Sequence, residues 1–171
     1  MENLLNKNVV KRVKEFLISY NANLKIIALN TTAKTALNAA KSLKCETGAI
    51  IKSLLIKTDD NFLICLVAGD KRCSFKKIKK ILQIKKVSMA TAQEVKANTG
   101  FTIGGVSPVA HIKKINIFID KSLKRFFNLY AAAGHPNCVF KINYNELVKI
   151  TNGSEFELTE WEKQKLEIIF Y

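Results

Sequence analysis

One glycine-rich segment contains the residue types that could hold a negatively charged oxygen. Residues 100–111, which we call the glycine loop, contain three of the chain's seven glycines and one of its two prolines. Glycine permits a positive φ and lets a ligand approach the backbone without meeting a Cβ atom, and proline removes a competing N–H group. The loop lacks the Gly-x-Gly of dinucleotide-binding turns and the Gly-Lys-Ser/Thr of P-loops. It is therefore either a tight turn or a cradle of backbone amides for an anion.

A lysine in an apolar strand is the second candidate for chemistry. Residues 49–56 have the pattern of a strand, on which Lys52 shares one face with three large apolar residues: Ile50, Leu54 and Ile56. Two interpretations of Lys52 follow. It is either a lysine that protects a sheet edge from aggregation or an ammonium group at the floor of a pocket.

The other reactive side chains do not form a metal site or a nucleophilic triad. The four cysteines show no Cys-x-x-Cys spacing, so we expect no metal, no cofactor and no disulfide, with Cys65 in the core. Ser107 has no histidine at an evident relay spacing. His111 is expected to lie at the surface or to support the loop. His135, beside Pro136, either bonds its own backbone in a turn or helps to shape a pocket.

The charge balance points to a polyanionic partner. The chain has 28 basic and 14 acidic residues, a formal net charge of +14, which favours RNA or DNA. Lysine-rich coding bias is the alternative, although such a bias would also enrich glutamate. The longest apolar run, residues 62–68, is too short to span a bilayer, and the N-terminus lacks a secretory pattern. We therefore expect a cytoplasmic protein without membrane contact.

One basic run is a candidate RNA-facing surface. Residues 71–86 contain eight basic residues and no acidic one. A solvated helix face is the simpler interpretation, but like charges three and four residues apart on a helix repel each other, and a phosphate backbone would relieve that repulsion. The predicted nucleic-acid-binding residues are Lys71, Arg72, Lys76, Lys77, Lys79, Lys80, Lys85 and Lys86.

The elements that position these residues follow from apolar spacing and cap signals. Helices are expected over residues 8–20, after a Thr32 cap with a small-residue face from Ala33 to Leu43, and over 74–82, 91–100 and 143–150. A capping box at residues 159–162 predicts a last helix over 159–171. Strands are expected over residues 24–29, 49–56, 62–68, 87–89, 115–119, 128–133 and 138–142. The pattern predicts a single α+β domain over residues 1–171.

Three short motifs follow one another in the chain: Ile50-Ile51-Lys52-Ser53-Leu54, then Gly100-Phe101 with Gly104-Gly105-Val106-Ser107-Pro108, then Ala131-Ala132-Ala133-Gly134-His135-Pro136-Asn137. In this order they resemble the YbaK/EbsC family, single-domain relatives of the editing insertion in bacterial prolyl-tRNA synthetase. The resemblance covers about residues 24–153. Three motifs in sequence make it more specific than a lone Gly-Gly-Val-Ser-Pro.

The resemblance implies a fold in which helices surround a mixed, curved β-sheet. It implies an aminoacyl-tRNA deacylase, an ester hydrolase that removes a small wrong amino acid in trans, most often from tRNA for proline, without a metal. Aminoacyl-tRNA is then the main partner and prolyl-tRNA synthetase a further candidate, and we expect a monomer or a weak dimer. The alternative is a non-catalytic module on the same scaffold that binds tRNA or a synthetase, with Trp161, Leu166, Ile168 and Ile169 as a contact face.

The resemblance also assigns roles to residues. Lys52 matches the family's essential lysine, and residues 104–108 match the loop around the reacting ester. Because an aminoacyl ester is already activated, we expect direct attack by water, with the oxyanion stabilised by loop amides. Lys52 is expected to position the substrate, and three contacts stay open for it: the terminal phosphate, the ester region of the 3′-adenosine, or the loop itself. The predicted catalytic residues are Lys52, Gly104 and Gly105. The implied substrate-binding residues are Thr32, Ser53, Val106, Ser107, Pro108, Gly134 and His135. Two positions depart from the family pattern. Ala110 stands where many members carry glycine, which predicts a stiffer end of the loop, and Ser53 stands where some subfamilies carry asparagine.

Overall fold

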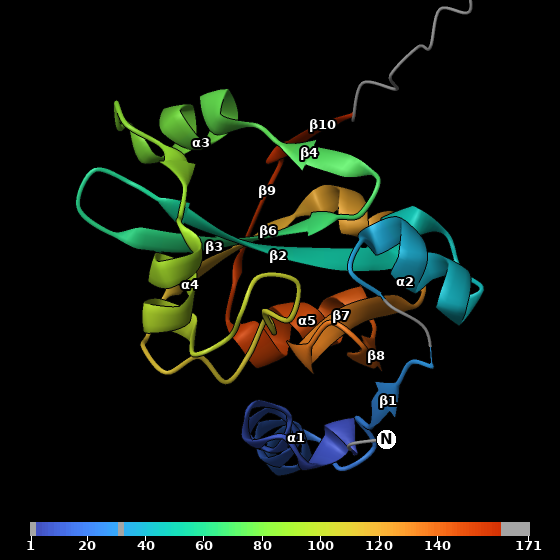
Figure 1. Ribbon diagram of the computed structural model, residues 1–171. Coiled ribbons are helices and arrows are strands. Elements are labelled where there is room, and N and C mark those ends of the chain that lie inside the picture. The colour runs from blue at the N-terminus through green and yellow to red at the C-terminus, as the bar shows by residue number, and fades with distance from the viewer. Residues whose placement is uncertain (1–2, 31–32, 162–171) are drawn as a thin grey trace, which may run out of the picture.

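Strands rich in apolar residues build a mixed β-sheet of eight strands (Figure 1). The computed structural model describes residues 3–30 and 33–161. The strand order is β1-β8-β7-β2-β3-β6-β9, and β5 pairs with another part of β2. The pairs β2–β7, β3–β6 and β6–β9 are parallel, and the others are antiparallel. The strands are β1 (Ile26–Ala28), β2 (Ile50–Lys57), β3 (Phe62–Ala68), β5 (Ser88–Met89), β6 (Asn116–Asp120), β7 (Leu129–His135), β8 (Cys138–Ile142) and β9 (Ser154–Phe156).

Apolar spacing and polar caps explain where the helices form. Helix α1 buries Val10, Val13 and Leu17, which recur at intervals of three and four residues. Helix α4 begins with the predicted capping box of Thr91 and Glu94. Within the described residues, no helix is long and apolar enough to cross a membrane. The helices are α1 (Asn8–Tyr20), α2 (Ala36–Leu43), α3 (Phe75–Leu82), α4 (Ala92–Thr99) and α5 (Tyr144–Thr151), with 3-10 turns at Leu4–Asn6, Thr47–Ala49 and Lys121–Arg125. The predicted α+β fold, a mixed sheet surrounded by helices, is confirmed.

The pleat of β2 sends consecutive side chains to opposite faces of the sheet. Leu55 packs in the largest core cluster together with Val106 of the glycine loop. Ile56 packs in a second cluster with Ile78 of α3, and on that second side α2 packs over Ile50. The glycine loop and α3 therefore cover opposite faces of the β2–β3 hairpin, as Figure 1 shows.

Helix α2 begins later than predicted. The side chain of Thr35 accepts a hydrogen bond from the Asn38 amide (3.2 Å) and caps the helix, which then starts at Ala36. Thr32, the predicted cap, lies outside the described residues. Thr35, three residues further along, provides the same capping hydroxyl. A threonine cap was therefore predicted correctly, but at the wrong position.

The predicted last helix is wrong where the structure describes it. Thr159–Trp161 form a strand, β10, which pairs antiparallel with β4 (Lys71–Cys73) in a separate two-stranded sheet. The Thr159 hydroxyl donates to the carboxylate of buried Asp120 (3.0 Å) rather than capping a helix. Cross-strand pairing and a buried acceptor therefore outweigh the local capping-box signal. Residues 162–171 of that prediction lie outside the described residues.

Candidate functional site

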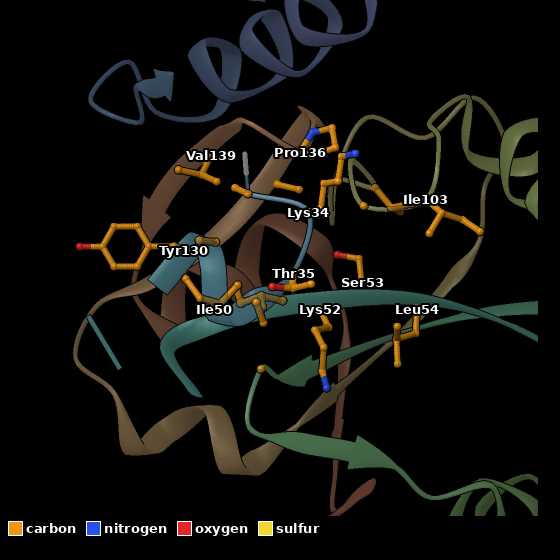
Figure 2. Close-up of a pocket in the computed structure, with 18 of the residues that line it drawn as sticks. Lys34, Thr35, Ile50, Lys52, Ser53, Leu54, Ile103, Tyr130, Pro136 and Val139 are labelled. Carbon is orange, nitrogen blue, oxygen red and sulfur yellow. The ribbon is translucent and has the colours of Figure 1, made fainter. Parts of the chain in front are cut away.

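A cavity lies where two parallel strands separate. β2 pairs with β7 only at Ile50 and Ile51, and it pairs with β5 only at Ile56 and Lys57. Between these two pairings one edge of β2 faces a cavity of about 460 Å³ (Figure 2). The segment before α2, the glycine loop and the turn between β7 and β8 form its other walls.

The glycine loop packs against the turn between β7 and β8, and the two segments meet at their glycines. A Cβ atom on Gly105 would lie 3.0 Å from both the carbonyl carbon and the carbonyl oxygen of Gly134, and 3.0 Å from the Cα atom of His135. The Gly105 amide donates to the Thr102 carbonyl (3.0 Å). Gly104, with φ +88°, and Val106 line the cavity, whereas Gly105 packs behind it. The structure therefore gives Gly105 a packing role and leaves Gly104 and Val106 beside the cavity.

Ser107 and His111 support the loop from within. Ser107 is fully buried, and its hydroxyl accepts a hydrogen bond from the Val109 amide (3.3 Å). The His111 Nε2 atom lies 2.7 Å from the Ser107 carbonyl, which can only accept, so Nε2 carries the proton and donates it. Burial lowers the pKa of His111 and keeps the imidazole neutral. Neither residue lines the cavity, and both bond within the loop.

The turn between β7 and β8 uses its histidine locally. The Nδ1 atom of His135 accepts a hydrogen bond from the Asn137 amide (3.1 Å), the backbone contact that is one of the two predicted alternatives. Pro136, rather than Gly134 or His135, lines the cavity. A Cβ atom on Gly104 would lie 3.4 Å from the Pro136 ring. The turn therefore shapes the cavity through proline and backbone.

Lys52 and Ser53 line the cavity from opposite sides of β2. The Lys52 ammonium donates to the Lys71 carbonyl on β4, and Figure 2 shows it pointing away from Ile103. Ser53 points to the side of Ile103 and Pro136. Its hydroxyl is buried and has no hydrogen-bond partner among the described residues. Ser53 therefore offers a donor and an acceptor to a cavity occupant, whereas the Lys52 ammonium is bonded to the backbone of β4.

The structure brings together only part of the predicted site. Lys52, Ser53, Gly104 and Val106 line the cavity, Ser107 and Pro108 are buried in the loop, and Thr32 lies outside the described residues. Other lining residues were not predicted as site residues, among them Lys34, Thr35, Ile103, Tyr130 and Pro136. For Lys34 and Thr35, the sequence signal was their position in the run Ala33-Lys34-Thr35, directly before a helix. In the described part of the chain, no group of His, Cys, Asp and Glu has a metal-binding arrangement.

The basic run divides into two parts. Lys71 lies 3.8 Å from the centre of the Trp161 ring, Arg72 pairs with Glu160 (2.6 Å), and Lys77 donates to the Thr159 carbonyl (2.7 Å). These three residues hold the small β4–β10 sheet together. The other five side chains are exposed on and after α3, across the β2–β3 hairpin from the glycine loop: Lys76, Lys79, Lys80, Lys85 and Lys86.

Comparison with known proteins identifies the same region. Residues 30–150 match the family model described as an aminoacyl-tRNA editing domain. Over 118 residues the chain is 32% identical to the proline–tRNA ligase of Bacillus subtilis, covering 68% of this chain and 21% of the ligase. The chain thus spans about a fifth of the length of that ligase.

Two smaller relatives match over most of their length. EbsC of Enterococcus faecalis, named as a proposed deacylase of Cys-tRNA(Pro) and Cys-tRNA(Cys), is 26% identical, with 73% of this chain and 77% of EbsC covered. A crystal structure of a protein proposed to be a trans-editing enzyme for prolyl tRNA synthetase superposes with a TM-score of 0.85. It is 30% identical and covers 90% of this chain and 98% of that chain. The fold is therefore that of this group.

Proposed function

The chain belongs to the aminoacyl-tRNA editing domain family, and from this premise we propose that it hydrolyses the ester that joins a small, wrongly attached amino acid to the 3′ end of tRNA for proline. Aminoacyl-tRNA editing is the function of the family. The amino acid, the tRNA and the roles of individual residues are our proposal. The observation that carries it is the cavity beside the open edge of β2, where Ser53, Gly104 and Val106 meet.

The cavity limits how water can be activated. Among the described residues that line it, the only titratable side chains are Lys34, Lys52 and Tyr130, with no histidine or carboxylate. An aminoacyl ester is already activated, so a positioned water and a stabilised oxyanion suffice for hydrolysis. The proton acceptor is then a hydroxyl of the substrate or a backbone carbonyl. The proposal includes no acyl-enzyme, because Ser107 is buried outside the cavity lining and the described lining residues include no histidine or carboxylate that could activate Ser53.

The oxyanion donors are the amides of the glycine loop that border the cavity. The Gly105 amide is already bonded to Thr102, so the amides of Gly104 and Val106 replace it in our proposal. One such donor contributes about 3 kcal/mol to transition-state stabilisation in other enzymes. Lys34 supplies a second contact, because it extends to the side of Pro136 and Ile103 and can meet the terminal phosphate (Figure 2).

Ser53 and Lys52 have separate tasks in this proposal. The Ser53 hydroxyl contacts the aminoacyl group, because it is buried, faces the cavity and has no partner among the described residues. Differences of one methylene or hydroxyl among alanine, serine, cysteine and threonine are worth about 1–3 kcal/mol in such a pocket. Lys52 positions the substrate from its place in the cavity lining, and its ammonium is oriented by the hydrogen bond to the Lys71 carbonyl of β4.

The test is deacylation of tRNA for proline charged with alanine, serine, cysteine or threonine. We expect hydrolysis of one or two of these substrates, abolished in Lys52→Ala and retained in Lys141→Ala, which removes an exposed strand lysine. Circular dichroism must show that Lys52→Ala folds. Turnover by Lys52→Ala at the wild-type rate would refute the assignment of Lys52.

A second candidate function is favoured by the five exposed lysines on the face opposite the glycine loop. They would let a non-catalytic module bind tRNA by charge alone. Salt-dependent tRNA binding without hydrolysis of any charged substrate would support this function and refute the first.

Association with prolyl-tRNA synthetase, and a monomeric or weakly dimeric state, are also proposals. Size-exclusion chromatography of a chain ending at Trp161 tests them. A chain cut at Gly153 would lose β9, β10 and the buried Leu158, so it would test folding instead. Co-elution of the full chain with the synthetase that disappears in the shorter chain would place the contact in residues 162–171.

A further inference from the structure

Arg12 connects the N-terminal helix to both ends of the glycine loop. It lies on α1, outside the residues that match the editing-domain model. Its Nε atom donates to the Ala110 carbonyl (2.9 Å), and its Nη2 atom donates to the Thr99 carbonyl (3.2 Å). These carbonyls flank the loop, since Thr99 ends α4 and Ala110 lies near the end of the loop. One planar guanidinium therefore fixes the distance between the two ends.

The first residues of the glycine loop leave space for the Arg12 guanidinium. A Cβ atom on Gly100 would lie 2.7 Å from the Arg12 Nη2 atom. The Arg12 guanidinium carbon lies 4.5 Å from the centre of the Phe101 ring, and fully buried Phe101 packs edge-on against His111. Gly100 therefore leaves space for the Arg12 guanidinium, and the Phe101 ring packs against it.

Arg12 also stabilises a strained residue. Ala110 has φ +60°, a left-handed conformation that disfavours residues with a Cβ atom. Strained backbone persists only where neighbouring groups hold it in place. The hydrogen bond from Arg12 to the Ala110 carbonyl is one such group.

The same helix packs against the second wall of the cavity. A Cβ atom on Gly134, which has φ +89°, would lie 2.7 Å from the carbonyl oxygen of Val9. Val9 and Arg12 are three residues apart and lie on neighbouring positions of one helix face. Helix α1 therefore contacts both loops whose glycines meet at Gly105.

We propose that Arg12 is a positioning residue for ester hydrolysis, which holds the glycine loop closed so that Gly104 and Val106 stay against the cavity. This inference rests on the proposed function. Arg12 touches no cavity surface and acts through the loop backbone. Its loss therefore changes the rate of the chemical step and leaves tRNA binding nearly unchanged.

The kinetic test compares Arg12→Gln and Arg12→Lys with Lys14→Gln, which removes an exposed charge from the same helix. Misplacing a catalytic group by an ångström costs up to about 100-fold in rate, so we expect kcat to fall between tenfold and 100-fold in Arg12→Gln. KM for charged tRNA should change less than twofold. Arg12→Lys should be intermediate, because one ammonium cannot match the fork of the guanidinium. Wild-type kcat in Arg12→Gln would overturn the proposal.

Hydrogen exchange provides a readout that needs no activity. In Arg12→Gln the amides of residues 101–110 should exchange at least about tenfold faster than in the wild type, whereas those of β3 should keep their protection. Unchanged exchange in the loop would overturn the proposal even if activity were lost. Uniformly faster exchange in every element would also overturn it, since that result indicates a general loss of stability. If the wild type hydrolyses no substrate but its loop loosens in Arg12→Gln, the proposed function fails and the positioning of the loop by Arg12 stands.

Discussion

The glycine loop and α3 lie on opposite faces of one hairpin and are held in opposite ways. In the loop, Phe101 and Ser107 are fully buried, and Arg12 and His111 bond its carbonyls. On α3 only Ile78 is buried, and Lys76, Lys79 and Lys80 are exposed. A fixed backbone suits chemistry that depends on sub-ångström placement. Mobile surface cations suit attraction to phosphates that needs no fixed geometry. The comparison therefore separates a site for reaction from a surface for affinity.

The largest effect should come from crowding the loop. Gly105→Ala would place a Cβ atom 3.0 Å from the Gly134 backbone, which cannot move aside as a side chain would. We expect a loss of stability of about 1–3 kcal/mol from overpacking and a fall in kcat/KM of about 100-fold from displacement of the loop. Urea unfolding and deacylation assays measure the two effects.

Gly153→Ala is the matched control for that change. Its Cβ atom would meet the Ile119 side chain at 2.7 Å, and neither Gly153 nor Ile119 lines the cavity. It should lose stability without losing activity in the folded fraction. If both variants lost activity only in proportion to unfolding, the loop would have no special place in catalysis.

Neutralising α3 should change affinity and leave the reaction intact. In Lys79→Gln/Lys80→Gln we expect weaker tRNA binding, and a salt dependence whose slope falls by about 0.7–0.9 for each phosphate that the protein no longer neutralises. The value of kcat at saturating tRNA should stay the same, because α3 lies across the hairpin from the loop. Filter binding over a range of salt concentrations gives the slope.

The control pair is Lys25→Gln/Lys141→Gln, two exposed lysines outside the basic run. It removes the same net charge. An equal loss of affinity in both pairs would mean that tRNA responds to overall charge and that α3 is no specific surface.

Protonation of His111 at low pH should destabilise the folded protein. Burial lowers the pKa of this imidazole below its ordinary value of 6.5, so the folded state favours the neutral form. The stability that results is complete above the ordinary pKa and is lost as pH falls through 6.5 toward the lowered value. We expect the melting temperature to fall between pH 7.5 and 5.5, and to fall less in His111→Gln, which keeps an N–H donor without titrating. His135→Gln, at the less buried histidine, should retain more of the wild-type slope.

Much of the fold could be predicted because its signals are local. The apolar spacing of α1, the Thr91–Glu94 capping box and the β2–β3 hairpin each depend on residues close in sequence. The helix predicted from Thr159 failed because its hydroxyl bonds Asp120, 39 residues away. Local signals cannot include that partner.

The candidate site, like the fold, could be predicted from the sequence only in part. The motifs identified Lys52, Ser53, Gly104 and Val106, which line one cavity. They could not show that Gly105 packs against Gly134, or that the arginine that holds the loop lies 98 residues before Ala110. Spacing along the chain identifies candidates for chemistry, and long-range packing decides which of them face the substrate.

The smallest expected effect comes from Ala110, at the end of the glycine loop. Its φ of +60° costs alanine more than glycine, so Ala110→Gly should gain about 0.5–1 kcal/mol of stability after the entropy of the unfolded glycine is deducted. Ala97→Gly, at an exposed position of α4, should lose about 1 kcal/mol for the same chemical change. Opposite signs in urea unfolding would show that the closed loop holds Ala110 under strain. A loss of stability in both variants would mean that the Ala110 backbone is not strained. The hydrogen bond from Arg12 to the Ala110 carbonyl would then not be needed to hold a strained conformation.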